Sequence, residues 1–226
     1  MTHDDGIIVP LAWPETKAIK EGKWYDYPME KLGFIKNDFW HVGHAAMLLI
    51  QKSTGAIYYS DFGRYHTPHK HGRVRIEDSD PDIKIPITAI FNQDGTVANI
   101  EEILDYLYIH EANHGEGYVI AALQHIDNFT ECHEKSLAMH EQDAIPYGPF
   151  AFPGTNCSRY VAQVSLRGNI GWWKKFLLRI PYTITPTPIS NVRVINSYAH
   201  YYKYDGKLHI KNSIHFSKKK LCTEEQ

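Results

Sequence analysis

The sequence predicts a single α+β domain with several antiparallel strands and about three helices. Two apolar, β-rich runs at 44–50 and 56–61 surround the turn segment QKSTG, a pattern typical of a β-hairpin. Residues 99–107 and 156–166 each combine a capping residue with helical apolar spacing. Because no internal repeat and no linker divides the 226 residues, we expect one domain over 1–226.

Composition excludes several function classes. With 43% hydrophobic and 22% charged residues, the chain has ordinary globular composition. A net charge of −2 gives no basic field, so we expect neither nucleic acid nor a membrane surface as a partner. The three cysteines form no CxxC pair, which excludes zinc-finger and thioredoxin motifs.

The N-terminal segment and the apolar runs bear on location. The start, MTHDDGIIVPLAWPE, has acids where a signal peptide would carry a basic and then an apolar run. The longest apolar stretch falls short of the ~18–20 residues of a membrane span. We therefore expect a cytoplasmic protein.

The first half of the chain is expected to alternate strands, loops and helices. Residues 6–40 read as loops and short elements packed by aromatic residues, and 63–73 as a polar, basic connection. The next expected elements are strands at 73–77, 85–91 and 117–126, a helix at 99–107 with Asn99 as its N-cap, and a polar helix at 129–143. The aromatic residues expected to pack the 6–40 segment are Trp13, Trp24, Tyr25, Phe39 and Trp40.

The second half is expected to begin with a Pro/Gly-rich loop that leads into a helix, capped by Thr155 or Asn156. Pro181, Pro186 and Pro188 predict extended backbone rather than helix over 172–191. The remainder is expected to form strands around a turn at Asp205–Gly206.

Cys157 is the strongest candidate for a catalytic nucleophile. It lies in the first turn of the predicted helix, where unpaired N–H groups and the helix dipole stabilise a thiolate. The same N–H groups can hold an oxyanion. The alternative is a small buried residue that fills core space.

A nucleophilic thiol needs a base, and His44 is the preferred candidate. It begins the first strand of the predicted hairpin, next to Gly43 and Ala45, whose small size permits close approach by another segment. His41 is a rival of opposite strand parity, so a regular strand cannot turn both rings toward one site.

Other histidines suggest metal binding more weakly. His66, His69 and His71 lie in the segment HTPHKH, whose spacing can present imidazoles to Zn²⁺. An exposed loop is the favoured interpretation, so we expect no metal and no cofactor. The neighbouring Arg64, Lys70, Arg73 and Arg75 suggest a basic rim for an anionic substrate group.

The segments GHAAMLLI, YYSD and GTNCSRYVAQV together resemble the circularly permuted branch of the NlpC-type papain-like enzymes, which includes the lecithin:retinol acyltransferase group. The resemblance covers roughly 41–63 and 147–166. It implies a papain-like antiparallel sheet or barrel packed against helices, with the nucleophile at a helix N-terminus. Relative to that fold, the resemblance implies an insertion around 64–146 and a strand-rich C-terminal extension.

The resemblance also implies roles for individual residues. Cys157 resembles the nucleophile and His44 the general base, while a polar residue within 59–61 completes a triad. Asp61 is the best chemical match because a carboxylate fixes the imidazole tautomer, with Tyr59 and Ser60 as alternatives. We expect Tyr147, Asn156, Ser158 and Arg159 to border the site and to contact substrate.

The expected function is a thiol hydrolase of the cysteine peptidase or amidase type. It would cleave an amide in a small peptide or a muropeptide-like substrate through an acyl-enzyme. The alternatives are an acyltransferase or thioesterase with the same triad, and a binding module that keeps the scaffold without catalysis.

Overall fold

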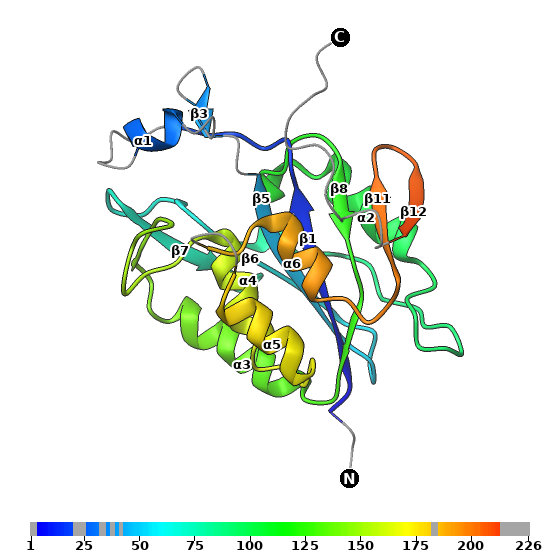
Figure 1. The fold of residues 1–226 in the computed structure, drawn as a ribbon. Coiled ribbons are helices and arrows are strands. Elements are labelled where there is room, and N and C mark those ends of the chain that lie inside the picture. The colour runs from blue at the N-terminus through cyan, green and yellow to red at the C-terminus, as the bar shows by residue number, and fades with distance from the viewer. Residues whose placement is uncertain are drawn as a thin grey trace.

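The computed structural model describes residues 4–19, 26–31, 35–36, 39–40, 43–181 and 185–212. Within these ranges the main element is a nine-stranded sheet of order β10-β7-β6-β5-β1-β8-β11-β12, with β9 also paired to β1 (Figure 1). All its pairings are antiparallel. Its strands are β1 (Gly6–Trp13), β5 (His44–Gln51), β6 (Ile57–Gly63), β7 (His71–Arg75), β8 (Val119–Ala121), β9 (Gln124–Ile126), β10 (Ile145–Pro146), β11 (His200–Tyr204) and β12 (Leu208–Asn212).

The remaining elements are a small sheet and the helices. The small sheet contains β2 (Ala18–Ile19), β3 (Ile35–Lys36) and β4 (Phe39–Trp40). The helices are α1 (Asp26–Lys31), α2 (Ile100–Ile109), α3 (Phe129–His140), α4 (Cys157–Ser165), α5 (Trp172–Arg179) and α6 (Pro188–Val194), with 3₁₀ turns at Pro81–Ile83 and Glu111–Asn113. The α+β class is confirmed. None of the helices in the described ranges is long and apolar enough to cross a membrane.

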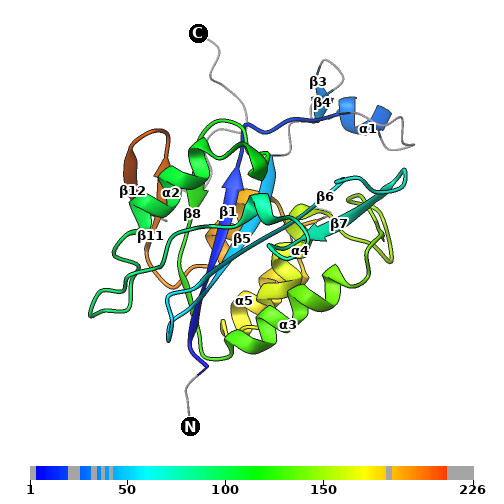
Figure 2. The ribbon, with the colours of Figure 1, turned by 180° about the vertical axis from the view of Figure 1, so that it is seen from behind.

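The sheet is covered on both faces. Alternate residues of β1 point to opposite sides, so Val9 joins a core with α2, whereas Ile8 joins a core with α3 and α4. Figure 1 shows α4, α5 and α6 in front of the sheet, and Figure 2 shows α2 on the other side. Burial on both faces explains why β1 and β5 are almost continuously apolar.

The predicted hairpin is present as β5 and β6. Its register places Ala46 opposite Asp61 and Ile50 opposite Ile57. The predicted loop-to-helix transition is also present, since α4 begins at Cys157 and buries Tyr160, Val161 and Val164. The hairpin and this helix pack together, and they form the part of the fold that positions the candidate site.

The N-terminal segment differs from the prediction. Gly6–Trp13 is not a loop but the strand β1, buried along its whole length and paired to β5. Pro10 fits there because β8 pairs with residues 11–12 and β9 with residues 6–8, which leaves Pro10 at the break between them. The missing N–H of this proline therefore interrupts no ladder on that side. The predicted packing of Trp24 and Tyr25 lies outside the described residues.

Other elements also differ. Residues 85–90 form no strand, and the predicted strand at 117–126 is divided into β8 and β9. The prediction of extended backbone over 172–191 was wrong, because α5 ends before Pro181 and α6 starts at Pro188. Proline at the first position of a helix loses no intrahelical bond, and Thr187 with Ser190 forms a capping box there. The described residues thus hold more than the expected three helices.

Candidate active site

The first turn of α4 places Cys157 against the start of β5. Asn156 is the N-cap, and its side chain accepts a 2.9 Å hydrogen bond from the N–H of Arg159. The Cys157 side chain is buried with 9% exposure, and the backbone N–H of Ala45 helps to lower the pKa of its thiol. The cap thus fixes where the helix begins, and this start holds the thiol beside the strand that carries His44.

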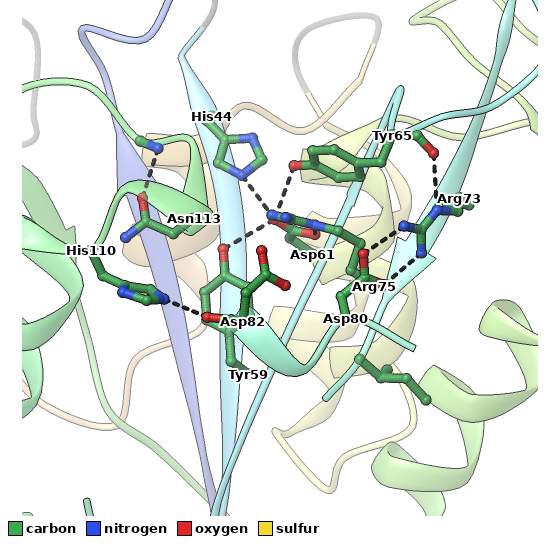
Figure 3. A network of polar contacts seen from close by, with 12 residues as sticks. His44, Tyr59, Asp61, Tyr65, Arg73, Arg75, Asp80, Asp82, His110 and Asn113 are labelled. Atoms are coloured by element: carbon green, nitrogen blue, oxygen red, sulfur yellow. Dashed lines mark hydrogen bonds and ion pairs between the residues drawn. The ribbon is translucent and has the colours of Figure 1, made fainter. Parts of the chain in front are cut away.

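The strand register brings His44 and Asp61 together. Asp61 lies directly opposite Ala46, and His44 shares the face of Ala46 because it is two residues away on the same strand. His44 Nε2 is 3.4 Å from Asp61 Oδ2 (Figure 3). Of the two alternatives for this position, Ser60 points to the opposite face, and Tyr59 donates its own hydroxyl to Asp61 at 3.1 Å.

His44 and Cys157 lie close enough to shift each other's pKa, upward for the imidazole and downward for the thiol. An imidazole has two nitrogens, and Nε2 faces Asp61, so Nδ1 is the nitrogen left for the sulfur. The imidazole thus lies between the thiol and the carboxylate. The rival base, His41, lies outside the described residues.

The charges of Cys157, His44 and Asp61 shift one another's pKa values. Burial lowers the pKa of His44, but its interactions with Asp61 and Cys157 outweigh this and raise the pKa from 6.5 to about 9. Burial raises the pKa of the Cys157 thiol, yet the hydrogen bond and charge of His44 lower it overall, below its usual 9.0. Both shifts favour the charged pair, a thiolate beside an imidazolium. Cys132 contrasts with this, because burial raises the pKa of its thiol to about 12.

Asp61 is completely buried and surrounded by donors that the sequence did not identify. Arg75 binds both carboxylate oxygens, Nε to Oδ1 at 3.0 Å and Nη2 to Oδ2 at 2.6 Å. Tyr65 donates its hydroxyl to Oδ2 at 3.0 Å. Against the cost of burial, the interactions with His44 and Arg75 hold the pKa of Asp61 well below its usual value.

The predicted basic rim is wrong for two of its members. Arg75 is buried on Asp61, and Arg73 forms a bidentate pair with Asp80 at 2.5 and 2.6 Å. Neither guanidinium is free to meet a substrate. The signal in the sequence was the alternation of Arg73, Val74 and Arg75, which places both arginines on one face of a strand.

Two of the predicted substrate contacts, Asn156 and Arg159, bind the protein's own backbone through their side chains, and a third, Ser158, is bound through its backbone. The Asn156 side chain caps α4, and the carbonyl of Ser158 accepts a 2.7 Å hydrogen bond from Asn191. Arg159 donates to carbonyl oxygens of the loop before α4, at 2.7 Å to Pro149 and 3.1 Å to Gly154. Tyr147 lies in the same loop and stacks on Phe62, with ring centroids 5.8 Å apart. Asn156 and Arg159 therefore shape the start of α4 and the loop before it, and Ser158 links α4 to α6.

A second loop borders His44 and was missed by sequence reasoning. The Trp13 ring lies 5.8 Å from that of His44, and a Cβ on Gly115 would fall 2.4 Å from Trp13 atoms. His114, in the left-handed backbone region at φ 54°, stacks on Tyr65 at 5.4 Å. This left-handed backbone of His114 is a local feature that is not visible in a sequence.

The histidines of the HTPHKH segment are not gathered into a ligand set. Within the described ranges, which include His66, His69 and His71, no three or more His, Cys, Asp or Glu side chains form a group that could hold a metal ion. The ring of His71 instead contacts the carbonyl of His69 at 3.0 Å.

Comparisons with known proteins identify the relatives of the chain. Residues 8–170 match the family model described as type VI secretion system effector TseH-like. A crystal structure of the type VI secretion system effector TseH is similar in fold, with a TM-score of 0.61 and 18% sequence identity, over 92% of this chain and 99% of that one. No curated protein matches the sequence. Because the family match spans most of the chain, this protein belongs to the TseH-like family of type VI secretion system effectors.

Proposed function

We propose that this protein is a type VI secretion effector that acts as a thiol hydrolase, with Cys157 as nucleophile, His44 as general base and Asp61 as the residue that orients His44. The observation that supports this most is the position of His44, whose Nε2 lies 3.4 Å from Asp61 Oδ2 and whose ring lowers the pKa of the Cys157 thiol at the start of α4. This is the arrangement that activates a thiol for attack on a carbonyl.

The mechanism follows from these contacts. The Cys157 thiolate attacks an amide carbonyl, and the imidazolium of His44 gives its proton to the leaving amine. Water, deprotonated by His44, then releases the acid from the acyl-enzyme and restores the thiol. In the first turn of α4, Asn156 already binds the N–H groups of Arg159 and Tyr160. The N–H groups of Cys157 and Ser158 are assigned to the oxyanion.

The proposed substrate is an amide in a peptide or a cell-wall-derived, muropeptide-like molecule. Such amides are the common substrates of the enzymes that the hairpin and GTNCSRY segments resemble. The family description adds secretion, so we propose that the protein acts outside the cell that makes it. This replaces the expectation of a purely cytoplasmic role with a proposal about where the substrate lies.

The same residues support acyl transfer, which differs only in what resolves the acyl-enzyme. A binding module without catalysis is less well supported, because recognition alone gives no reason for a buried thiol whose pKa is lowered by an imidazole. Adding a primary amine during the assay below distinguishes hydrolysis from transfer by the mass of the product.

The proposed function predicts cleavage with a bell-shaped pH dependence. Purified sacculi and muropeptides are incubated with the protein from pH 4 to 10, and new amino termini are quantified by mass spectrometry. Activity should fall above about pH 9, where the imidazolium of His44 loses its proton. It should also fall at acidic pH, where the thiolate of Cys157 is protonated. If no amide is cleaved in either material, the substrate assignment is wrong.

A further inference from the structure

We propose that Arg75 is a positioning residue of the active site, which holds both oxygens of Asp61 and thereby fixes which nitrogen of His44 faces Cys157. This inference rests on the proposed function. Arg75 touches neither the thiol nor any substrate, and it acts through Asp61.

Arg75 lies closer to the Asp61 carboxylate than His44 does and binds both of its oxygens. Its Nη2 lies 2.6 Å from Oδ2 and its Nε 3.0 Å from Oδ1, whereas His44 Nε2 is 3.4 Å from Oδ2. A bidentate guanidinium fixes the plane of a carboxylate, which a single contact cannot do. The orientation of Asp61 toward His44 is therefore set mainly by Arg75 (Figure 3).

Strand pairing and packing fix Arg75 itself. In the ladder, Ala46, Asp61 and Arg75 lie in one cross-strand row over β5, β6 and β7. The guanidinium lies over the ring of Tyr65, with its central carbon 3.8 Å from the centroid, and the residue is only 3% exposed. A buried row of this kind has little freedom to rearrange.

The charges around His44 show what the pair of Asp61 and Arg75 does. Cys157 approaches from α4, Asp61 from β6 and Arg75 from β7, while His114 comes from the loop after α2. Arg75 offsets the negative charge of Asp61, so Asp61 orients His44 without holding its proton too strongly. Removing Arg75 should strengthen the negative field on His44 and, at the same time, release the orientation of Asp61.

The test compares Arg75→Met with Arg73→Met. Arg73 is the matched control, because it lies two residues away on the same strand and has its own bidentate aspartate, Asp80, outside the site. In Arg75→Met we expect kcat on muropeptides to fall about 10- to 100-fold with KM unchanged, as for other groups that orient a reacting residue. The alkaline limb of the pH profile should move up by about one pH unit. Arg73→Met should change neither.

Arg75→Lys is a second variant that tests the same role if Arg75→Met does not fold. Lysine keeps the charge but cannot bind both oxygens, so kcat should fall while the alkaline limb stays in place. The inference is overturned if Arg75→Met or Arg75→Lys retains wild-type kcat. Alkylation of Cys157 by iodoacetamide separates the two claims: a wild-type thiol that reacts slowly refutes the proposed function, whereas a fast wild-type thiol with unaffected Arg75 variants refutes only the positioning role.

Discussion

Replacing Cys157 by serine should lower amide hydrolysis by at least about 10⁴-fold, which is the scale of losing a nucleophile from a catalytic triad. A serine hydroxyl at the start of α4 keeps the size of the side chain but cannot form a stable anion beside His44. The helix cap by Asn156 does not involve the sulfur, so the variant should fold. Initial rates on muropeptides at pH 7, with thermal unfolding measured in parallel, give the result.

Cys132→Ser is the matched control for this substitution. Cys132 is buried in the core on the same face of the sheet, and its thiol has a raised pKa of about 12. Burying a hydroxyl there should destabilise the fold by about 1–3 kcal/mol, with little change in turnover. Catalysis by Cys157 would be refuted if Cys157→Ser kept more than a tenth of the wild-type rate.

Replacing Asp61 by asparagine should cost both stability and activity. Arg75 would remain buried without its counter-ion, and breaking a buried pair from one side costs roughly 3–5 kcal/mol. The amide also loses the charge that orients His44, for which we expect a fall in turnover of about 10⁴-fold. Urea unfolding at 25 °C and muropeptide cleavage measure the two effects.

Two comparisons interpret the Asp61 result. Asp80→Asn breaks the Arg73–Asp80 pair. Its side chains are 18% and 13% exposed, against 4% and 0% for Arg75 and Asp61, so this substitution should cost less stability than Asp61→Asn and leave turnover intact. The double variant Asp61→Asn with Arg75→Met should recover part of the lost stability, because no charge is then left unpaired. A double variant less stable than Asp61→Asn alone would argue against the unpaired charge as the cause.

The local parts of the fold were predictable from the sequence. The hairpin of β5 and β6 follows from two apolar runs around a glycine turn, and the start of α4 follows from an Asn cap after a Pro/Gly loop. Those two segments hold Cys157, His44 and Asp61, so the three candidate residues could be named before their contacts were seen. Their proximity depends on the register of the β5–β6 hairpin. A shift of one residue in that register would turn a different side chain toward His44, and the sequence alone does not fix it.

The rest depended on long-range packing. The segment that forms β1 was predicted as loops and short elements because prolines interrupt its apolar runs. The gap between β8 and β9 that accommodates Pro10 arises from pairing with distant strands, which the local sequence does not show. The role of Arg75 was hidden for a similar reason, since its partner is 14 residues away on a neighbouring strand. Pro188 was read as a helix breaker, although at the first position of α6 it is compatible with a helix.

Activation of Cys157 by His44 is tested most directly by the alkylation rate of this thiol. Iodoacetamide is reacted with the wild type and with His44→Ala at pH 6, and mass spectrometry follows the modification of Cys157. A thiol of ordinary pKa is almost wholly protonated at that pH, whereas a thiolate paired with imidazolium reacts. We predict fast reaction in the wild type and a fall of about 100-fold in His44→Ala. Equal rates in the two proteins would contradict the account.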